Sequence, residues 1–206
     1  MKKIFNKFLA VFVSFVMAVG MVPFSGVVAD AATVVGDSSI LTTVYKQVQS
    51  SDLAGGDQVL ITYNGNVLVA KDSTTAAKSD TTISPNASEI TNPPAGSVWN
   101  LVESTTDSDK YFFEVTAVET GNMPESGANR LKVDDNGLYI GDESSGFTLA
   151  SDGRIYRERS GLPPYYGIAY ENDFIGKAYY KTFLGGTVIS NATKFTFYKK
   201  IDVAKL

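Results

Sequence analysis

The residue types best suited to binding chemistry gather in the last third of the chain. Five tyrosines fall within sixteen residues there, with an amide and a carboxylate among them: Tyr165, Tyr166, Tyr170, Tyr179, Tyr180, Asn172 and Asp173. A tyrosine offers a rigid apolar ring with a polar tip, so several rings can bind a sugar or a peptide as a platform. We therefore predict a ligand platform in this region. The alternative is that these are ordinary strand residues, because tyrosine has a high β propensity.

A second candidate is the acidic turn Asp134-Asp135-Asn136, which Asp142 and Glu143 follow closely. Oxygen donors at both ends of a short hairpin could hold Ca²⁺, but the spacing lacks the alternating donors and the closing glutamate of a calcium loop. Acidic residues are also common in turns for local hydrogen-bonding reasons. We therefore predict neither a metal site nor a cofactor.

Three of the four arginines, Arg154, Arg157 and Arg159, lie close together in the sequence. Arginine side chains bind anionic ligands well. In an extended strand, however, Arg157 and Arg159 point to one side and Arg154 to the other. Glu158 lies between them, and charges on an edge strand discourage unwanted strand pairing. This favours a solvated or edge strand over an anion site.

Histidine and cysteine are both absent. No Ser-His-Asp or Cys-His nucleophile system can therefore form, and neither can a zinc site of the usual kind. Glycoside hydrolysis needs two carboxylates on either side of a cleft. The candidates considered are Glu103, Glu114, Glu158 and Glu171, and no motif selects a pair among them. We expect a protein that is not an enzyme, with a carboxylate-dependent hydrolase as a distant alternative.

Residues 1–31 have the features of a secretory signal peptide. Lys2, Lys3 and Lys7 form a basic start, an apolar run follows to about Ala29, and small residues then precede a cleavage site at Ala31. An uncleaved anchor is the alternative, because the run is about as long as a membrane span. We predict a secreted protein with a flexible leader at residues 32–39 and no membrane contact after cleavage. A cysteine-free exported chain is typical of Gram-positive bacteria.

The predicted mature chain is acidic. Removing the three lysines and one aspartate of residues 1–31 reduces 18 basic and 22 acidic residues to 15 and 21, a formal net charge of −6. Such a surface disfavours nucleic acid as a partner.

Residues 40–206 predict a single all-β domain of ordinary size. Asn64-Gly65 suits the positive φ angles of a two-residue hairpin turn, with β-rich runs on both sides. In that register Thr62 faces Val67, Ile61 faces Leu68 and the next pair outward is also apolar, so both faces of the hairpin are apolar. A hairpin of this kind should lie in the middle of a sheet or barrel.

The rest of the domain alternates short β-rich runs with turns, giving about eleven to thirteen strands and no helix. Residues 71–97 are the exception, because they are rich in Ser, Thr, Ala, Asn and Pro. We expect a low-complexity loop there, either a disordered insertion or a loop that covers a ligand. Many short strands with regular turns favour an antiparallel barrel, or alternatively a β-sandwich.

Three stretches resemble small all-β accessory modules of secreted bacterial proteins: residues 45–61, 99–103 and 195–200. The first has their aromatic strand, Ser-x-x-Leu turn, Gly-Asp pair and apolar strand. The resemblance implies a small barrel, trefoil-like or OB-like, and implies little about activity. The leading functional hypothesis is a non-catalytic binding module for glycan or cell-envelope material. The alternative is a structural or adhesive extracellular protein that acts through protein–protein contacts.

Overall fold

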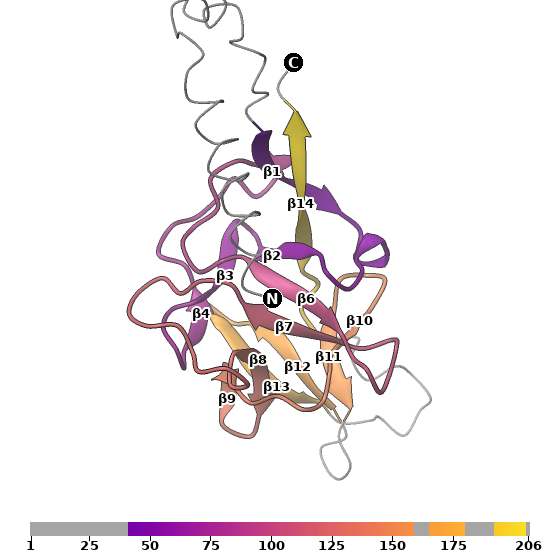
Figure 1. Cartoon of the computed structure of the whole chain (residues 1–206). Coiled ribbons are helices and arrows are strands. Elements are labelled where there is room, and N and C mark those ends of the chain that lie inside the picture. Colours follow the sequence, from indigo (N-terminus) through magenta and orange to yellow (C-terminus); the bar gives the residue numbers. More distant parts are fainter. Residues whose placement is uncertain (1–40, 159–164, 180–191, 205–206) are drawn as a thin grey trace, which may run out of the picture. The chain divides into compact units, whose positions relative to one another are not determined.

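The computed structural model describes residues 41–158, 165–179 and 192–204 (Figure 1). All described elements are strands except one 3₁₀ turn, η2 (Ser50–Asp52). The all-β class predicted from the sequence is confirmed. The predicted signal peptide and leader lie outside the described residues. In the part that is described, no helix is long and apolar enough to cross a membrane.

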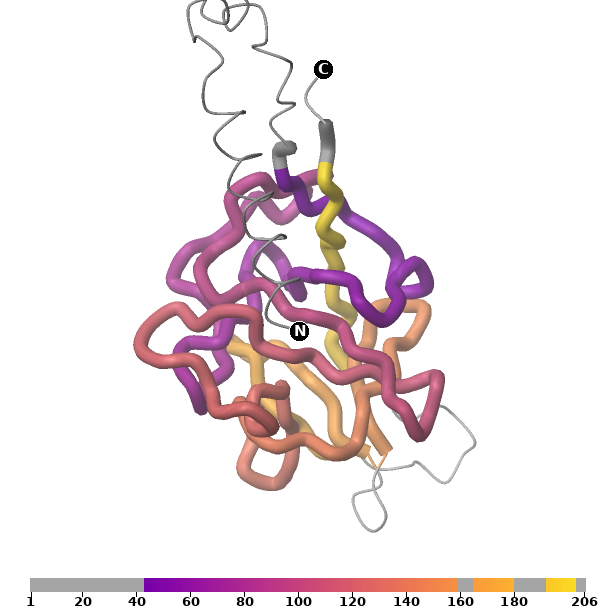
Figure 2. Tube along the Cα trace, viewed as in Figure 1, coloured from indigo at the N-terminus to yellow at the C-terminus, as the bar shows by residue number. Residues whose placement is uncertain are grey.

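Ten strands form one antiparallel sheet, with the order β5-β1-β14-β2-β6-β7-β8-β9 and with β3 and β4 branching from β2. They are β1 (Leu41–Val48), β2 (Gln58–Tyr63), β3 (Asn66–Ala70), β4 (Ala76–Lys78), β5 (Glu89–Ile90), β6 (Trp99–Glu103), β7 (Tyr111–Val115), β8 (Arg130–Asp134), β9 (Gly137–Gly141) and β14 (Thr196–Ala204). The first and last of these in the chain, β1 and β14, lie side by side along eight residue pairs (Figure 2).

Four further strands form a second antiparallel sheet in the order β10-β11-β12-β13. They are β10 (Thr148–Leu149), β11 (Ile155–Glu158), β12 (Tyr165–Tyr170) and β13 (Phe174–Tyr179). Both sheets are open along their order, so the described strands do not form the closed barrel that we expected. Two open sheets are consistent with the sandwich given as the alternative.

The Asn64-Gly65 hairpin is confirmed at its turn but not along its length. Both turn residues have positive φ, +48° and +80°, and Thr62 faces Val67 as predicted. From Leu68 onward β3 pairs with β4, while β2 pairs with β14 on one side and with β6 on the other. β2 and β3 diverge after the turn, because β2 pairs with three strands, β3, β6 and β14. This is also why the larger sheet branches.

The main core contains buried side chains of both sheets. Trp99, Leu101 and Phe113 come from the larger sheet, and Ile155 and Tyr166 come from the smaller one. All five are at most 1% exposed. The indole Nε1 of Trp99 donates a hydrogen bond of 3.2 Å to the carbonyl of Leu68, which satisfies its buried polar atom.

The segment 71–97 is more structured than the low-complexity loop that we expected. It contains β4 and β5, and β5 pairs with β1 through Ile90 and Tyr45. Ile90 packs in a second buried cluster with Tyr45, Leu60 and Tyr198, and the Tyr198 hydroxyl donates to the carbonyl of Ala87 at 2.8 Å. The segment therefore covers the second apolar face of the sheet. This burial is what a hairpin that is apolar on both faces requires.

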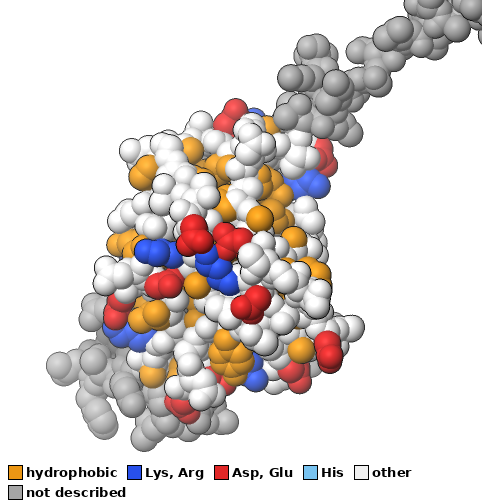
Figure 3. All heavy atoms as spheres, turned by 90° about the vertical axis from the view of Figure 1, so that its left-hand side faces the viewer, with side chains coloured by type: hydrophobic (Ala, Val, Ile, Leu, Met, Phe, Trp, Pro, Cys, Tyr) orange, Lys and Arg blue, Asp and Glu red, His pale blue; other side chains and the backbone are white. Residues whose placement is uncertain are grey.

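On the face of the molecule shown in Figure 3, acidic, basic and apolar side chains are interspersed. Lys71 pairs with two carboxylates, at 3.1 Å from Asp80 and 2.6 Å from Glu119. Asp80 is exposed, so its pair with Lys71 contributes little to stability, about 0 to 1 kcal/mol, whereas Lys71 and Glu119 are both partly buried.

Candidate functional site

The described tyrosines of the predicted platform do not share one flat surface. Tyr165 packs in a small cluster with Tyr156 and Tyr179, whereas its neighbour Tyr166 belongs to the main core. This division follows from the alternation of side chains along β12. The rings of Tyr156 and Tyr165 are 6.1 Å apart at an interplanar angle of 75°, so they do not form a coplanar pair.

Burial limits the other platform residues further. Tyr166 is 1% exposed and Tyr179 is 7% exposed. Tyr170 is partly buried and packs against Tyr63, with ring centroids 5.0 Å apart. Tyr180 lies outside the described residues. The interpretation as strand and core residues thus accounts for Tyr166, Tyr170 and Tyr179.

Asn172 and Asp173 form the turn between β12 and β13. Asn172 has a φ of +69°, which asparagine tolerates better than most residues. The Asp173 carboxylate accepts backbone N–H groups of Lys78 at 2.6 Å and Phe174 at 2.7 Å. Asp173 therefore fastens β4 to the start of β13, and this role is structural.

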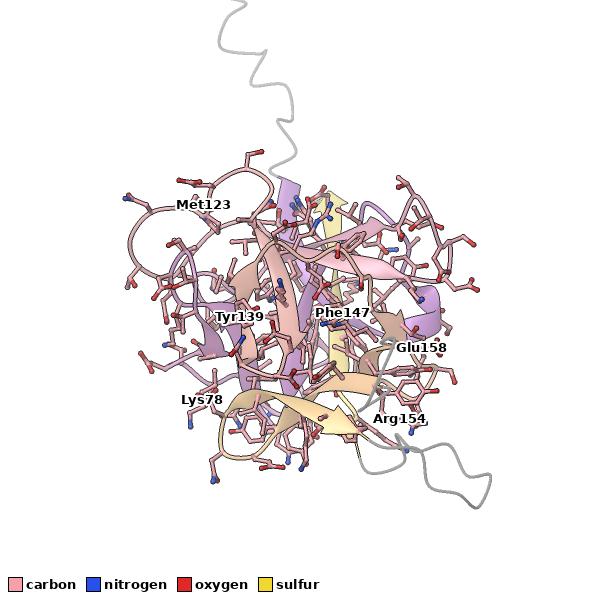
Figure 4. The ribbon with its side chains drawn as sticks, turned by 90° about the horizontal axis from the view of Figure 1, so that it is seen from below. Lys78, Met123, Tyr139, Phe147, Arg154 and Glu158 are labelled. Atoms are coloured by element: carbon pink, nitrogen blue, oxygen red, sulfur yellow. The ribbon has the colours of Figure 1, made fainter. Side chains whose placement is uncertain are left out.

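The structure instead brings three sequence motifs together around a pocket of about 560 Å³. Its walls come from the turn after β8, from the loop after β9, from β11 and from β12: Asp134, Asp135, Asn136, Ser145, Arg157, Glu158 and Tyr166. The acidic turn, the arginine-rich strand and the tyrosine-rich strand each contribute. Figure 4 views the molecule from below, with Tyr139, Phe147 and Glu158 labelled.

Arg157 is positioned by the pairing of β11 with β12, which sets it opposite Tyr166. Its guanidinium carbon lies 5.4 Å from the centroid of the Tyr166 ring. Its Nε and Nη2 donate to the carbonyl of Val133 at 3.0 and 2.5 Å. Nη1 donates to none of the described residues, and Arg157 is one of the residues that line the pocket.

Glu143 lies behind the wall of the pocket and is 2% exposed. Its Oε1 accepts the backbone N–H of Ser145 at 2.8 Å, and its Oε2 lies 3.5 Å from Arg157 Nε. Oε2 has no hydrogen-bond partner among the described residues. Ser145 and Arg157 both line the pocket. A buried carboxylate is costly unless it is paired, so Glu143 and Arg157 depend on each other.

The acidic turn is held in place by tyrosine hydroxyls. Tyr139 donates to Asp134 at 2.5 Å, the backbone N–H of Asn136 donates to the same carboxylate at 2.8 Å, and Tyr166 donates to Asp135. Burial alone would raise the pKa of Asp134, but these hydrogen bonds and the charge of Lys132 outweigh it and lower the pKa. Burial and the hydrogen bond to Asp134 raise the pKa of Tyr139 to about 12.

The pocket carboxylates do not form a metal centre. Within residues 41–158, 165–179 and 192–204, no group of three or more His, Cys, Asp or Glu side chains could hold a metal ion. Of the four glutamates considered for a hydrolase, only Glu158 lines the pocket. Glu114 pairs with Arg130 at 3.0 Å, and Glu171 pairs with Lys177.

The sequence motifs contain most of the residues that line the pocket, but no motif predicts that these residues lie close together. Asp134, Arg157 and Tyr166 belong to three different motifs. The β11–β12 pairing sets Arg157 opposite Tyr166, and the two sheets meet where Arg157 donates to the carbonyl of Val133, next to Asp134. Glu143 was named only as a partner of Asp142 in a calcium hypothesis. Comparison of the whole chain with protein families, curated proteins and solved structures finds no match.

Proposed function

We propose that this is a secreted, non-catalytic module that binds glycan or cell-envelope material, and that its ligand enters the pocket around Arg157. The supporting observation is a pocket of about 560 Å³ whose lining residues are all polar or charged, with Tyr166 among them. Its volume falls within the range of about 300–1,000 Å³ that is usual for small-ligand sites. The tyrosine platform is not needed for this proposal.

The chemistry of the lining suits a polyhydroxylated ligand. A sugar hydroxyl both donates and accepts hydrogen bonds, and the pocket lining includes carboxylate acceptors at Asp134 and Glu158 and a guanidinium donor at Arg157. Hydrogen bonds that involve a charged group are the stronger ones. An apolar ligand would leave these groups desolvated and unpaired, which costs free energy.

The site is also held in place before any ligand arrives. Arg157 is fixed by Val133 and by the Tyr166 ring, and Asp134 is fixed by Tyr139. A ligand therefore does not have to order these side chains, and less affinity is lost on binding.

A glycan array tests this proposal with two matched variants. Arg157→Gln removes the pocket donor, whereas Arg154→Gln removes a neighbouring arginine that pairs with Asp152 outside the pocket lining. We expect wild type and Arg154→Gln to bind the same glycan class and Arg157→Gln to lose it. Because Arg157 supports the fold as well, Glu158→Gln serves as a second pocket variant at an exposed position. Equal binding by all four proteins would refute the assignment to this pocket.

A second candidate, adhesion through protein–protein contacts, is favoured by the edge of β1. On the side of β1 away from β14, β5 pairs only with Tyr45 and Lys46, and the described residues supply no second strand there for residues 41–44. An open strand edge can accept a strand of another protein. Ile201, which faces Val44 across the ladder, is 37% exposed. If a protein binds this edge and also covers the exposed Ile201 of the neighbouring strand β14, Ile201→Lys should weaken the association in sedimentation experiments and leave glycan binding unchanged.

A hydrolase is less well supported by the pocket. A general acid needs a carboxyl group that holds its proton near neutral pH. The lowered pKa of Asp134 is the opposite of that requirement.

A further inference from the structure

We propose that β14 controls the folding of this domain: no stable core forms until this strand has inserted between β1 and β2. The proposal is independent of the proposed binding function. It follows from the central place of β14 in the larger sheet, from the entry of its side chains into two buried clusters, and from its contacts with segments that are distant in the sequence.

β14 is the last described strand in the sequence, but it is not an edge strand of the larger sheet. It pairs with β1 along eight residue pairs and with β2 along four (Figure 1). On its other side, β1 pairs with β5 through only two residue pairs. Among the described strands, β14 is therefore the main partner of β1, and β2 loses one of its ladders without it.

Adjacent side chains of β14 enter two buried clusters, because side chains alternate along a strand. Phe197 belongs to the main core and Tyr198 to the second buried cluster, and each is 1% exposed. Phe195, directly before the strand, also belongs to the main core. The loss of one buried aromatic side chain removes a large part of the small net stability of a domain. We therefore expect neither cluster to be stable while these aromatic side chains are missing.

β14 and the residue before it also contact parts of the chain outside the larger sheet's centre. The Tyr198 hydroxyl donates to the carbonyl of Ala87, which lies in the segment 71–97. The Phe195 ring stacks on that of Phe174 in the smaller sheet, with centroids 5.8 Å apart. This end of the chain thus joins the segment 71–97 and the smaller sheet to the larger one.

The pairing of β14 with β1 is strongly non-local. The Thr43 hydroxyl donates to Asp202 at 3.2 Å across this pairing, and the two residues are 159 positions apart. Closing so long a loop costs conformational entropy before any contact is gained, which makes such pairings slow to form. Because a chain is synthesised from its N-terminus, every other described strand is made before β14. The domain then has to wait for its last described strand.

Limited proteolysis of ribosome-bound chains tests the proposal. The whole chain is followed by flexible linkers of increasing length and a stalling sequence, so that residues 196–204 lie inside the exit tunnel with short linkers and outside it with long ones. We expect no protease-resistant core with the short linkers and a resistant core with the long ones. A resistant core that forms while residues 196–204 are still inside the tunnel would overturn the proposal.

Two proline variants of the released chain compare a central strand with an edge strand. Lys199→Pro removes a backbone N–H from β14, between β1 and β2. Glu89→Pro changes β5, where the Gln47 N–H donates to the carbonyl of Ser88 at 3.1 Å. Hydrogen-bonded pairs alternate along an antiparallel ladder, so the Glu89 N–H points away from β1. We expect Lys199→Pro to lose protease resistance in both sheets and Glu89→Pro to keep it. A resistant core in Lys199→Pro that lacks only β1, β5 and β14 would contradict the proposal.

Hydrogen exchange of the wild-type protein gives a second measurement that needs no variant. The amides of Phe197 and Tyr198 should exchange only through global unfolding, with the same denaturant dependence as those of Phe113 in β7 and Ile168 in β12. Faster exchange of Phe197 and Tyr198 through a smaller opening would show that β14 detaches from a core that stays folded. That result would overturn the proposal.

Discussion

Arg157 and Tyr166 face each other across the β11–β12 ladder, with the guanidinium carbon 5.4 Å from the centroid of the tyrosine ring. This contact joins the buried ion pair with Glu143 to the acidic turn, because the Tyr166 hydroxyl donates to Asp135. One strand pair thus supports both the fold and the proposed binding pocket.

The first prediction concerns the stability of the pair formed by Arg157 and Glu143. Arg157→Gln leaves the Glu143 carboxylate buried without a charged partner, so we expect a loss of about 3 kcal/mol in the free energy of unfolding. The double variant Arg157→Gln/Glu143→Gln should lose much less stability than the sum of the losses in the two single variants. Urea unfolding of the four proteins measures this coupling, and strictly additive losses would contradict it.

The second prediction compares two buried tyrosine hydroxyls. The Tyr179 hydroxyl has no hydrogen-bond partner in the described part of the chain, whereas the Tyr198 hydroxyl donates to Ala87 at 2.8 Å. Tyr179→Phe should leave stability unchanged or raise it, and Tyr198→Phe should lower it by about 1 kcal/mol. Thermal unfolding compares the two. A larger loss for Tyr179→Phe than for Tyr198→Phe would show that the Tyr179 hydroxyl is bonded in solution.

The third prediction concerns the alkaline stability of the acidic turn. The pKa of Tyr139 rises from 10.0 to about 12 because of burial and the hydrogen bond to Asp134. Between these values the unfolded chain loses the proton and the folded chain keeps it, so the contribution of Tyr139 is present below pH 10 and declines as the pH rises to about 12.

Other tyrosines also titrate in this range, so the difference between wild type and Tyr139→Phe isolates the contribution of this group. Their difference in unfolding free energy should shrink between pH 10 and pH 12. A difference that stays constant through this window would contradict the assigned hydrogen bond.

The fourth prediction uses two glycines with positive φ. A Cβ on Gly65 would lie 2.5 Å from the carbonyl oxygen of Ile83, whereas a Cβ on Gly56 would meet nothing within 4 Å. Gly56→Ala should cost about 1 kcal/mol for the left-handed conformation alone. Gly65→Ala should cost clearly more, because the segment 71–97 must move away. Equal costs in chemical unfolding would mean that this segment does not pack on the hairpin.

The sequence predicted local structure well where a short pattern determines it. The turn at Asn64-Gly65 forms with positive φ at both residues, and Thr62 faces Val67 across the two strands as predicted. Residues 71–97 were missed because their β pairing depends on distant partners. Ile90 is an isolated large apolar residue in a polar segment, and its pairing partner Tyr45 lies far away in the sequence, on β1.

The candidate site was predictable only in pieces for the same reason. The acidic turn, Arg157 and Tyr166 each had an ordinary explanation, and each was a reasonable strand or turn residue by itself. Their convergence depends on how the β8–β9 turn meets the small sheet, which no local pattern determines. The tyrosine platform was expected from composition, but alternation along β12 sends adjacent tyrosines to opposite faces.

The central claim is that the ligand binds in the pocket around Arg157. Backbone NMR during titration with a glycan that the protein binds tests this claim most directly. We predict that the largest shifts fall on the amides of residues 134–136, Ser145, Arg157 and Tyr166, which line the pocket. The amides of Tyr156 and Tyr165, in the cluster on the other face of the small sheet, should change little. Shifts concentrated on that cluster or on the β1 edge, with the pocket unaffected, would contradict the assignment of ligand binding to this pocket.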